Sequence, residues 1–181
     1  MSASRPTLVL VPGLMCDATS WGGVPAGLPE YDCTVVEHGT ADSLVQMAEQ
    51  VLAQAPARFA LAGHSMGGRV ALEVMRMAPQ RVTHLGLFDT GHLPKAPGAA
   101  GDEEVRKRMA LLDIARTQGV RAMASEWVKG MVAPQRLNDH ALIGSILEMF
   151  ERKSADIFEC QLRALIQRPD ATPVLGAVKV P

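Results

Sequence analysis

The 181-residue sequence has no run of about 18 consecutive apolar residues, which excludes a membrane-spanning helix. It also has no excess of one charge, since 18 Lys and Arg residues are balanced by 19 Asp and Glu residues. Nucleic acid and anionic lipid are bound by clustered Lys and Arg, so this balance argues against both as the main partner. Internal repeats and low-complexity tracts are absent as well.

Cysteine is scarce. Cys16, Cys33 and Cys160 are far apart and odd in number, which fits no disulfide framework and suits a reducing cytoplasm. Their spacing matches no zinc site, and we expect no metal or other cofactor. Residues 1–6 lead directly into a strand-like segment without a secretory signal pattern. The sequence therefore predicts a cytoplasmic globular protein.

The first half of the chain alternates between short apolar runs and amphipathic stretches. Strands are predicted at residues 7–11, 33–36, 59–62 and 82–88, and helices at residues 43–55 and 67–78. Such alternation is typical of an α/β fold with a mainly parallel sheet and flanking helices. We interpret residues 1–93 as the N-terminal part of an α/β core.

The pattern changes after residue 93. Proline and glycine mark a loop, and four amphipathic stretches follow with no strand between them. Their apolar faces fall within residues 105–112, 120–127, 143–150 and 158–166. Because these faces need a surface to cover, we interpret residues 94–169 as a helical cap inserted into the core. Residues 170–181 are interpreted as the start of the return to the core, approaching another strand.

The segment Gly63-His64-Ser65-Met66-Gly67 matches the pattern Gly-x-Ser-x-Gly, with a predicted strand before it and a helix after it. A serine that attacks a carbonyl must project from a sharp turn, and flanking glycines let the backbone pass close to its neighbours. The following helix N-terminus places free N–H groups beside a developing oxyanion. The alternative is a glycine-rich turn that happens to contain a serine. The pattern predicts Ser65 as a nucleophile.

A second loop, Pro12-Gly13-Leu14, follows the first strand. In a sheet of this type it lies next to the serine turn, so the backbone N–H groups of Leu14 and Met66 would form a two-donor oxyanion hole. The alternative is an ordinary turn at the end of a strand. Gly13 and the residue before the serine, His64, are predicted to border the substrate pocket.

These segments resemble the α/β-hydrolase family, in particular its cap-bearing, esterase-like members. The resemblance rests on residues 8–14 with Asp17 and Trp21, on residues 61–68 and 87–90, and on residues 168–170 leading into 178–181. One departure is Pro12, where many members carry histidine before the glycine.

The resemblance implies a sheet in the spatial order second, first, third and fourth strand. It also implies a serine hydrolase acting on a small-molecule, ester-like substrate, with the triad in the chain order nucleophile, acid, histidine. In this family the acid and the histidine normally follow two further core strands. Those strands would lie beyond Pro181, so we expect the C-terminal core strands to be missing and the chain to be incomplete.

Two residues of the chain are nevertheless candidates for the acid and the base. Asp89 ends the strand beside the serine strand, at the edge where ligands bind in open α/β sheets, although it would equally well cap the turn. His92 would act as general base only if its loop folded back over Ser65. Of the other histidines, His64 is expected to point away from Ser65, and His84 to pack within its strand.

The cap supplies the last candidate. Trp127, with several methionines, would line an apolar acyl pocket or simply pack the interior of the cap. Two alternatives stay open for the function. The same fold also serves C–C bond hydrolysis, lactone hydrolysis and acyl transfer, and a non-catalytic binding protein would keep the pocket without the chemistry. The sequence leaves the substrate and the oligomeric state open.

Overall fold

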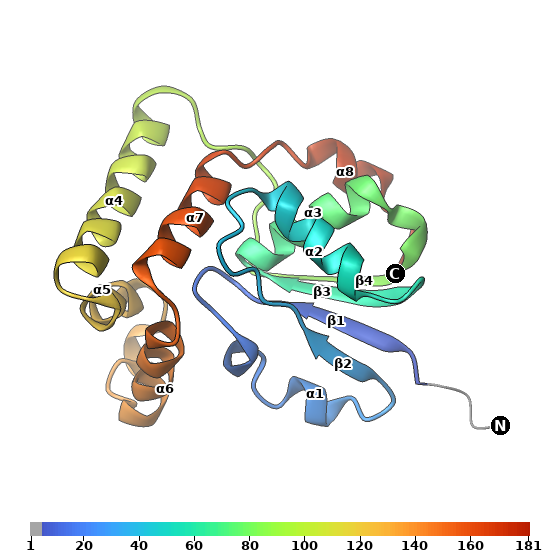
Figure 1. Ribbon diagram of the computed structural model, residues 1–181, viewed down its shortest axis with the longest axis horizontal. Coiled ribbons are helices and arrows are strands. Elements are labelled where there is room, and N and C mark those ends of the chain that lie inside the picture. Colours follow the sequence, from blue (N-terminus) through green and yellow to red (C-terminus); the bar gives the residue numbers. More distant parts are fainter. Residues whose placement is uncertain (1–4) are drawn as a thin grey trace.

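The computed structural model describes residues 5–181, so most of the segment tested for a signal pattern lies outside the described residues. Four parallel strands form one sheet in the order β2-β1-β3-β4 (Figure 1). The strands are β1 (Thr7–Val11), β2 (Asp32–Val35), β3 (Phe59–His64) and β4 (Val82–Phe88). The predicted fold class and strand order are confirmed. β1 and β3 are buried almost throughout, as expected of continuous apolar runs in a parallel sheet.

One face of the sheet is covered by α2 (Leu44–Gln54) and α3 (Met66–Met77) (Figure 1). Both helices lie where the apolar spacing predicted them. The hydroxyl of Ser43 accepts the N–H of Gln46 and caps α2, and the buried positions Leu44, Met47 and Val51 face the core.

Within residues 5–181, the elements on the opposite face are the short 3-10 turn η1 (Ala18–Trp21) and the single-turn helix α1 (Val24–Gly27). Alternate residues of β1 and β3, such as Leu10 and Ala62, form a second apolar cluster there with Trp21. A cavity of about 460 Å³ lies over this face.

After β4 the chain forms the four predicted helices without an intervening strand. They are α4 (Gly98–Thr117), α5 (Val120–Trp127), α6 (His140–Glu151) and α7 (Ala155–Ile166). The 3-10 turns η3 (Val128–Gly130) and η4 (Pro134–Arg136) lie between α5 and α6, whereas the turn η2 (Pro79–Arg81) comes earlier, between α3 and β4. We call residues 94–169 the helical segment. Its interior, with Phe150 and Phe158, is continuous with the apolar cluster of the α3 face, so the two parts share one core.

The C-terminal segment differs from the prediction. Residues expected to approach a strand first form the helix α8 (Thr172–Ala177), with Pro173 in its first turn, where proline is well tolerated. Only then does the chain extend, and the carbonyl of Pro181 accepts the N–H of Leu85 in β4 at 2.9 Å.

In residues 5–181 we find no helix with the length and apolarity needed to cross a bilayer. The same residues contain no group of three or more His, Cys, Asp or Glu side chains arranged to hold a metal ion.

Candidate active site

Ser65 forms the turn between β3 and α3, with φ of 52° and ψ of −114°. Residues other than glycine rarely adopt positive φ, which costs about 1–3 kcal/mol. Two hydrogen bonds hold the turn: the Ser65 N–H donates to the carbonyl of Phe88 at 2.9 Å, and Thr90 Oγ1 donates to the carbonyl of Ser65 at 2.7 Å. The hydroxyl of Ser65 does not cap α3. The strained turn predicted from the motif is therefore present.

The glycines of the motif are required by close backbone contacts. A Cβ atom on Gly67 would lie 2.0 Å from the carbonyl oxygen of Val11, and one on Gly63 would lie 2.3 Å from the carbonyl oxygen of Gly67. Both distances are far inside van der Waals contact. The serine turn can thus sit this tightly against β1 only because these positions carry no side chain.

The loop after β1 lies against the serine turn, as expected. A Cβ atom on Gly13 would be 3.4 Å from Cβ of Ser65 and 3.2 Å from Nδ1 of His64. Leu14 and Met66 are buried, with 5% and 1% of their surface exposed. Among residues 5–181 the Leu14 N–H has no hydrogen-bond acceptor, and Met66 begins α3, where N–H groups lack intrahelical partners.

The candidate acid stands directly after β4, between Phe88 and Thr90, which both bond to the serine turn, and the candidate base lies in the loop that follows. Asp89 is exposed, with φ of 43°, and His92 is half-buried in the next loop. The carbonyl of His92 accepts the N–H of Ala171 at 2.9 Å. Hydrogen bonds from Thr172 lower the pKa of Asp170, and the nearby His92 lowers it further. In the described part of the chain, no hydrogen bond connects the side chains of Asp89 or His92 to the serine.

No family model matches the chain. It is 26% identical over 175 residues to a putative esterase/lipase of Haemophilus influenzae, covering 90% of this chain and 58% of that protein. It is 33% identical over 95 residues to a pimeloyl-[acyl-carrier protein] methyl ester esterase of Nitrosomonas europaea, covering 48% of this chain and 38% of that protein. The chain therefore spans less than two thirds of these curated relatives.

Solved structures are similar over almost the whole chain. An esterase from Thermogutta terrifontis superimposes with a TM-score of 0.81 at 23% identity, covering 97% of this chain and 69% of that one. The enol-lactonase from Burkholderia xenovorans LB400 superimposes with a TM-score of 0.83 at 18% identity, covering 99% of this chain and 71% of that one. The chain has the α/β-hydrolase fold. The predicted resemblance to this fold is thereby confirmed.

Two histidines of the α/β-hydrolase core, His64 and His84, lie on the sheet face opposite α2 and α3. His64 points away from the α3 face, and its buried Nδ1 has no hydrogen-bond partner in the described residues. It lines the 460 Å³ cavity with Trp21 and Phe88. The prediction that His84 packs within its strand is wrong: β4 lies at the sheet edge and little covers this face, so His84 is exposed.

Trp127 lies inside the helical segment. Its ring is 5.4 Å from that of Phe150 and 5.8 Å from that of Phe158, and it lines a cavity of about 390 Å³ between α4, α5 and α7. Ser65 and Leu14 do not contribute to that cavity. The structure therefore places Trp127 in a cluster of aromatic rings separate from the serine turn.

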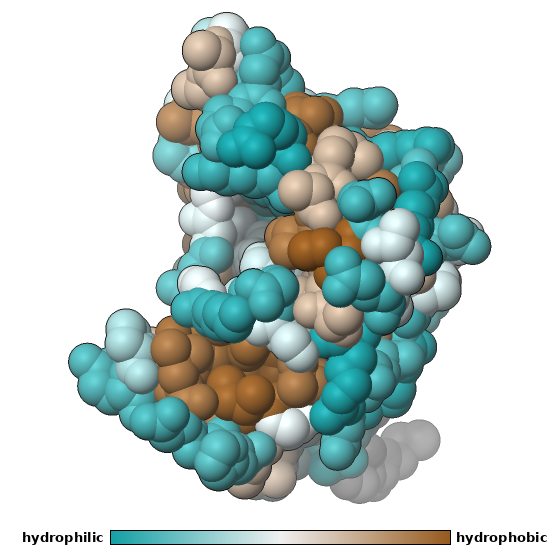
Figure 2. Space-filling view, turned by 90° about the vertical axis from the view of Figure 1, so that its left-hand side faces the viewer, coloured by the Kyte–Doolittle hydropathy of each residue, from teal (hydrophilic) through white to brown (hydrophobic). Residues whose placement is uncertain are grey.

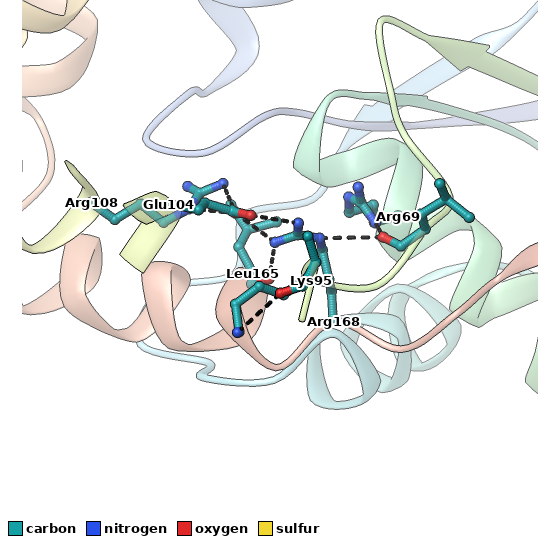
Figure 3. A network of polar contacts seen from close by, with 8 residues as sticks. Arg69, Lys95, Glu104, Arg108, Leu165 and Arg168 are labelled. Carbon is teal, nitrogen blue, oxygen red and sulfur yellow. Dashed lines mark hydrogen bonds and ion pairs between the residues drawn. The ribbon is translucent and has the colours of Figure 1, made fainter. Parts of the chain in front are cut away.

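The segments that join the α/β-hydrolase core to the helical segment are held together by a polar network that the sequence analysis missed (Figure 3). Arg168, which follows α7, makes two hydrogen bonds to Glu104 of α4, at 2.7 and 2.8 Å. Arg168 and Arg108 lower the pKa of Glu104 to about 2, against the opposing effect of burial. Arg168 and Arg69 of α3 also donate to one carbonyl, that of Leu93. We call these five residues the connector network.

Proposed function

We propose that the protein is a serine hydrolase acting on ester-like carbonyls, with Ser65 as nucleophile. The observation that carries this proposal is the strained turn at Ser65 with the Gly13–Leu14 loop packed against it. In the reaction, Oγ of Ser65 forms a bond to the carbonyl carbon, and the carbonyl electron pair moves onto oxygen. The N–H groups of Leu14 and Met66 stabilise the resulting oxyanion, each contributing about 3 kcal/mol in comparable sites.

The serine also needs a base, because a hydroxyl at its ordinary pKa is a weak nucleophile. A histidine would accept the Oγ proton and pass it to the leaving alkoxide, and water would then release the acyl group by the reverse proton path. His92 and Asp89 are the candidates within the chain. Because no hydrogen bond joins the side chain of His92 or Asp89 to Ser65 in residues 5–181, we favour a histidine and an acid supplied by residues beyond Pro181.

We further propose that the helical segment, residues 94–169, is a cap that forms the substrate pocket. Its anchoring to the core supports this: Arg152, which follows α6, binds the buried Asp17 at 2.8 Å, and Lys153 binds Glu37 at 2.7 Å. Seen from the side on which α4, α5 and α6 lie, the surface has a hollow lined by apolar side chains (Figure 2). A small ester with an apolar acyl group fits such a surface. The similarity to an enol-lactonase makes a cyclic ester the second candidate.

The test is hydrolysis of a p-nitrophenyl ester by the 181-residue chain and by a form extended through the reading frame that follows Pro181. We expect the extended form to be faster by orders of magnitude, and to lose this rate on Ser65→Ala. Equal rates for wild type and Ser65→Ala in both forms would favour the non-catalytic binding protein. Full Ser65-dependent activity of the 181-residue chain would instead make His92 and Asp89 the base and the acid.

A further inference from the structure

Gln161 is a buried polar residue on the inner face of α7, with 4% of its surface exposed. Its neighbours on that face, Phe158, Leu162 and Leu165, are apolar and buried. An amide in such surroundings is costly unless it is hydrogen-bonded. Oε1 of Gln161 accepts the backbone N–H of Met15 at 2.8 Å, so a buried hydrogen bond joins α7 to the loop after β1.

The loop in question is a tight turn with an unfavourable residue. The carbonyl of Gly13 accepts the N–H of Cys16 at 3.0 Å, which closes a four-residue turn. Met15 occupies its third position with φ of 61°. A positive φ at this position is typical of a type II turn and is normally adopted by glycine. The alternative type I turn has a negative φ there and reverses the peptide between Leu14 and Met15.

The hydrogen bond from Met15 to Gln161 exists in only one of these two turns. Reversing the Leu14–Met15 peptide would turn the Met15 N–H away from α7 and leave the buried Oε1 without a donor. The acceptor that matches the left-handed conformation of Met15 thus lies 146 residues further along the chain.

We propose that Gln161 is the positioning residue of the oxyanion loop. Leu14 lies in the same turn, and its N–H is the donor that the proposed function assigns to the oxyanion hole beside Ser65. Since Gln161 belongs to the helical segment, displacement of α7 would remove the acceptor and release the turn. Packing of α7 against the core and formation of the oxyanion hole are then coupled. The role in catalysis rests on the proposed function, whereas the effect on the turn does not.

Three variants of the 181-residue chain test this. Gln161→Met removes the acceptor at similar length, Gln161→Glu keeps an oxygen acceptor, and Gln167→Met changes an exposed glutamine at the end of the same helix. The measurements are the hydrogen-exchange rate of the Met15 amide and the ¹H–¹⁵N shifts of Met15 and Leu14. Amide shifts in β3 report whether each variant is folded.

We expect a protected Met15 amide in the wild type and in Gln167→Met. In Gln161→Met it should exchange at least tenfold faster, with a changed Leu14 shift, and Gln161→Glu should restore most of the protection. Equal protection in a folded Gln161→Met would overturn the proposal. If that variant does not fold, rapid exchange of the Met15 amide in the wild type or in a folded Gln161→Glu would overturn it.

A kinetic measurement addresses catalysis separately. In a form that hydrolyses an ester in a Ser65-dependent manner, Gln161→Met should lower kcat at least tenfold with little change in KM, and Gln161→Glu should recover part of the loss. An unchanged kcat would overturn the catalytic role of Gln161. Absence of Ser65-dependent hydrolysis in every wild-type form would count against the proposed function alone, because the exchange rates still decide whether Gln161 holds the turn.

Discussion

Arg168 and Glu104 connect the two ends of the helical segment through two hydrogen bonds between a guanidinium and a carboxylate. Only 10% of the Arg168 side chain and 26% of the Glu104 side chain are exposed. This pair therefore joins the start and the end of the helical segment, where the chain leaves and re-enters the core. Arg69 extends the contact to α3 because it donates to the carbonyl of Leu93.

Loss of this pair should destabilise the protein measurably. We expect Arg168→Met to lower the free energy of unfolding by on the order of 1–2 kcal/mol, allowing for solvent screening of the partly exposed carboxylate. Urea denaturation at pH 7 measures this. Arg106→Met is the control, because Arg106 pairs with the more exposed Glu103 and should change stability by less than about 0.5 kcal/mol. Equal losses of stability in Arg168→Met and Arg106→Met would contradict a special stabilising role of the Arg168–Glu104 pair.

The same pair predicts a pH dependence. The pKa of Glu104 is lowered to about 2 in the folded protein. The stabilisation that its carboxylate gives the folded state is therefore fully present above the ordinary pKa of about 4.3 and is lost as the pH falls toward 2. Wild type and Glu104→Gln should therefore differ most in stability near pH 7 and converge near pH 2. Denaturation curves across this range provide the test, and a difference that stays constant down to pH 2 would count against it.

Gly67 should tolerate no side chain. A Cβ atom there would lie 2.0 Å from a backbone oxygen of β1, so Gly67→Ala should cost more than about 3 kcal/mol or prevent folding. Gly144 in α6 has open space around its position, and Gly144→Ala should raise stability by about 0.5–1 kcal/mol. Thermal unfolding of both variants gives the comparison, and a stable Gly67→Ala would contradict the packing described for the serine turn.

Cys16 should be unreactive in the folded protein. Burial and the neighbouring Asp17 raise the pKa of its thiol to about 12, so it stays protonated at any physiological pH. A thiol reagent at pH 8 should modify the less buried Cys33 and Cys160 first, and Cys16 only after denaturant is added. Mass spectrometry of the modified peptides identifies the order. Rapid native modification of Cys16 would contradict its burial.

The fold could be predicted largely from local sequence patterns. Continuous apolar runs mark β1 and β3, and the glycine-flanked Ser65 marks the turn, because these depend on residues close together in the chain. His84 could not be placed, since its exposure depends on what covers one face of the sheet. The contact between Gln161 and Met15 could not be predicted either, because a glutamine among apolar residues does not indicate a partner 146 positions away. The roles of Asp89 and His92 stay predictions.

The central claim is that Ser65 is the nucleophile, and covalent labelling by an activated organophosphonate tests it most directly. Peptide mapping should locate a single adduct on Ser65 in the extended form, slower labelling of the same residue in the 181-residue chain, and none in Ser65→Ala. An adduct on another residue, equal labelling of Ser65→Ala, or no labelling of the extended form would contradict the account.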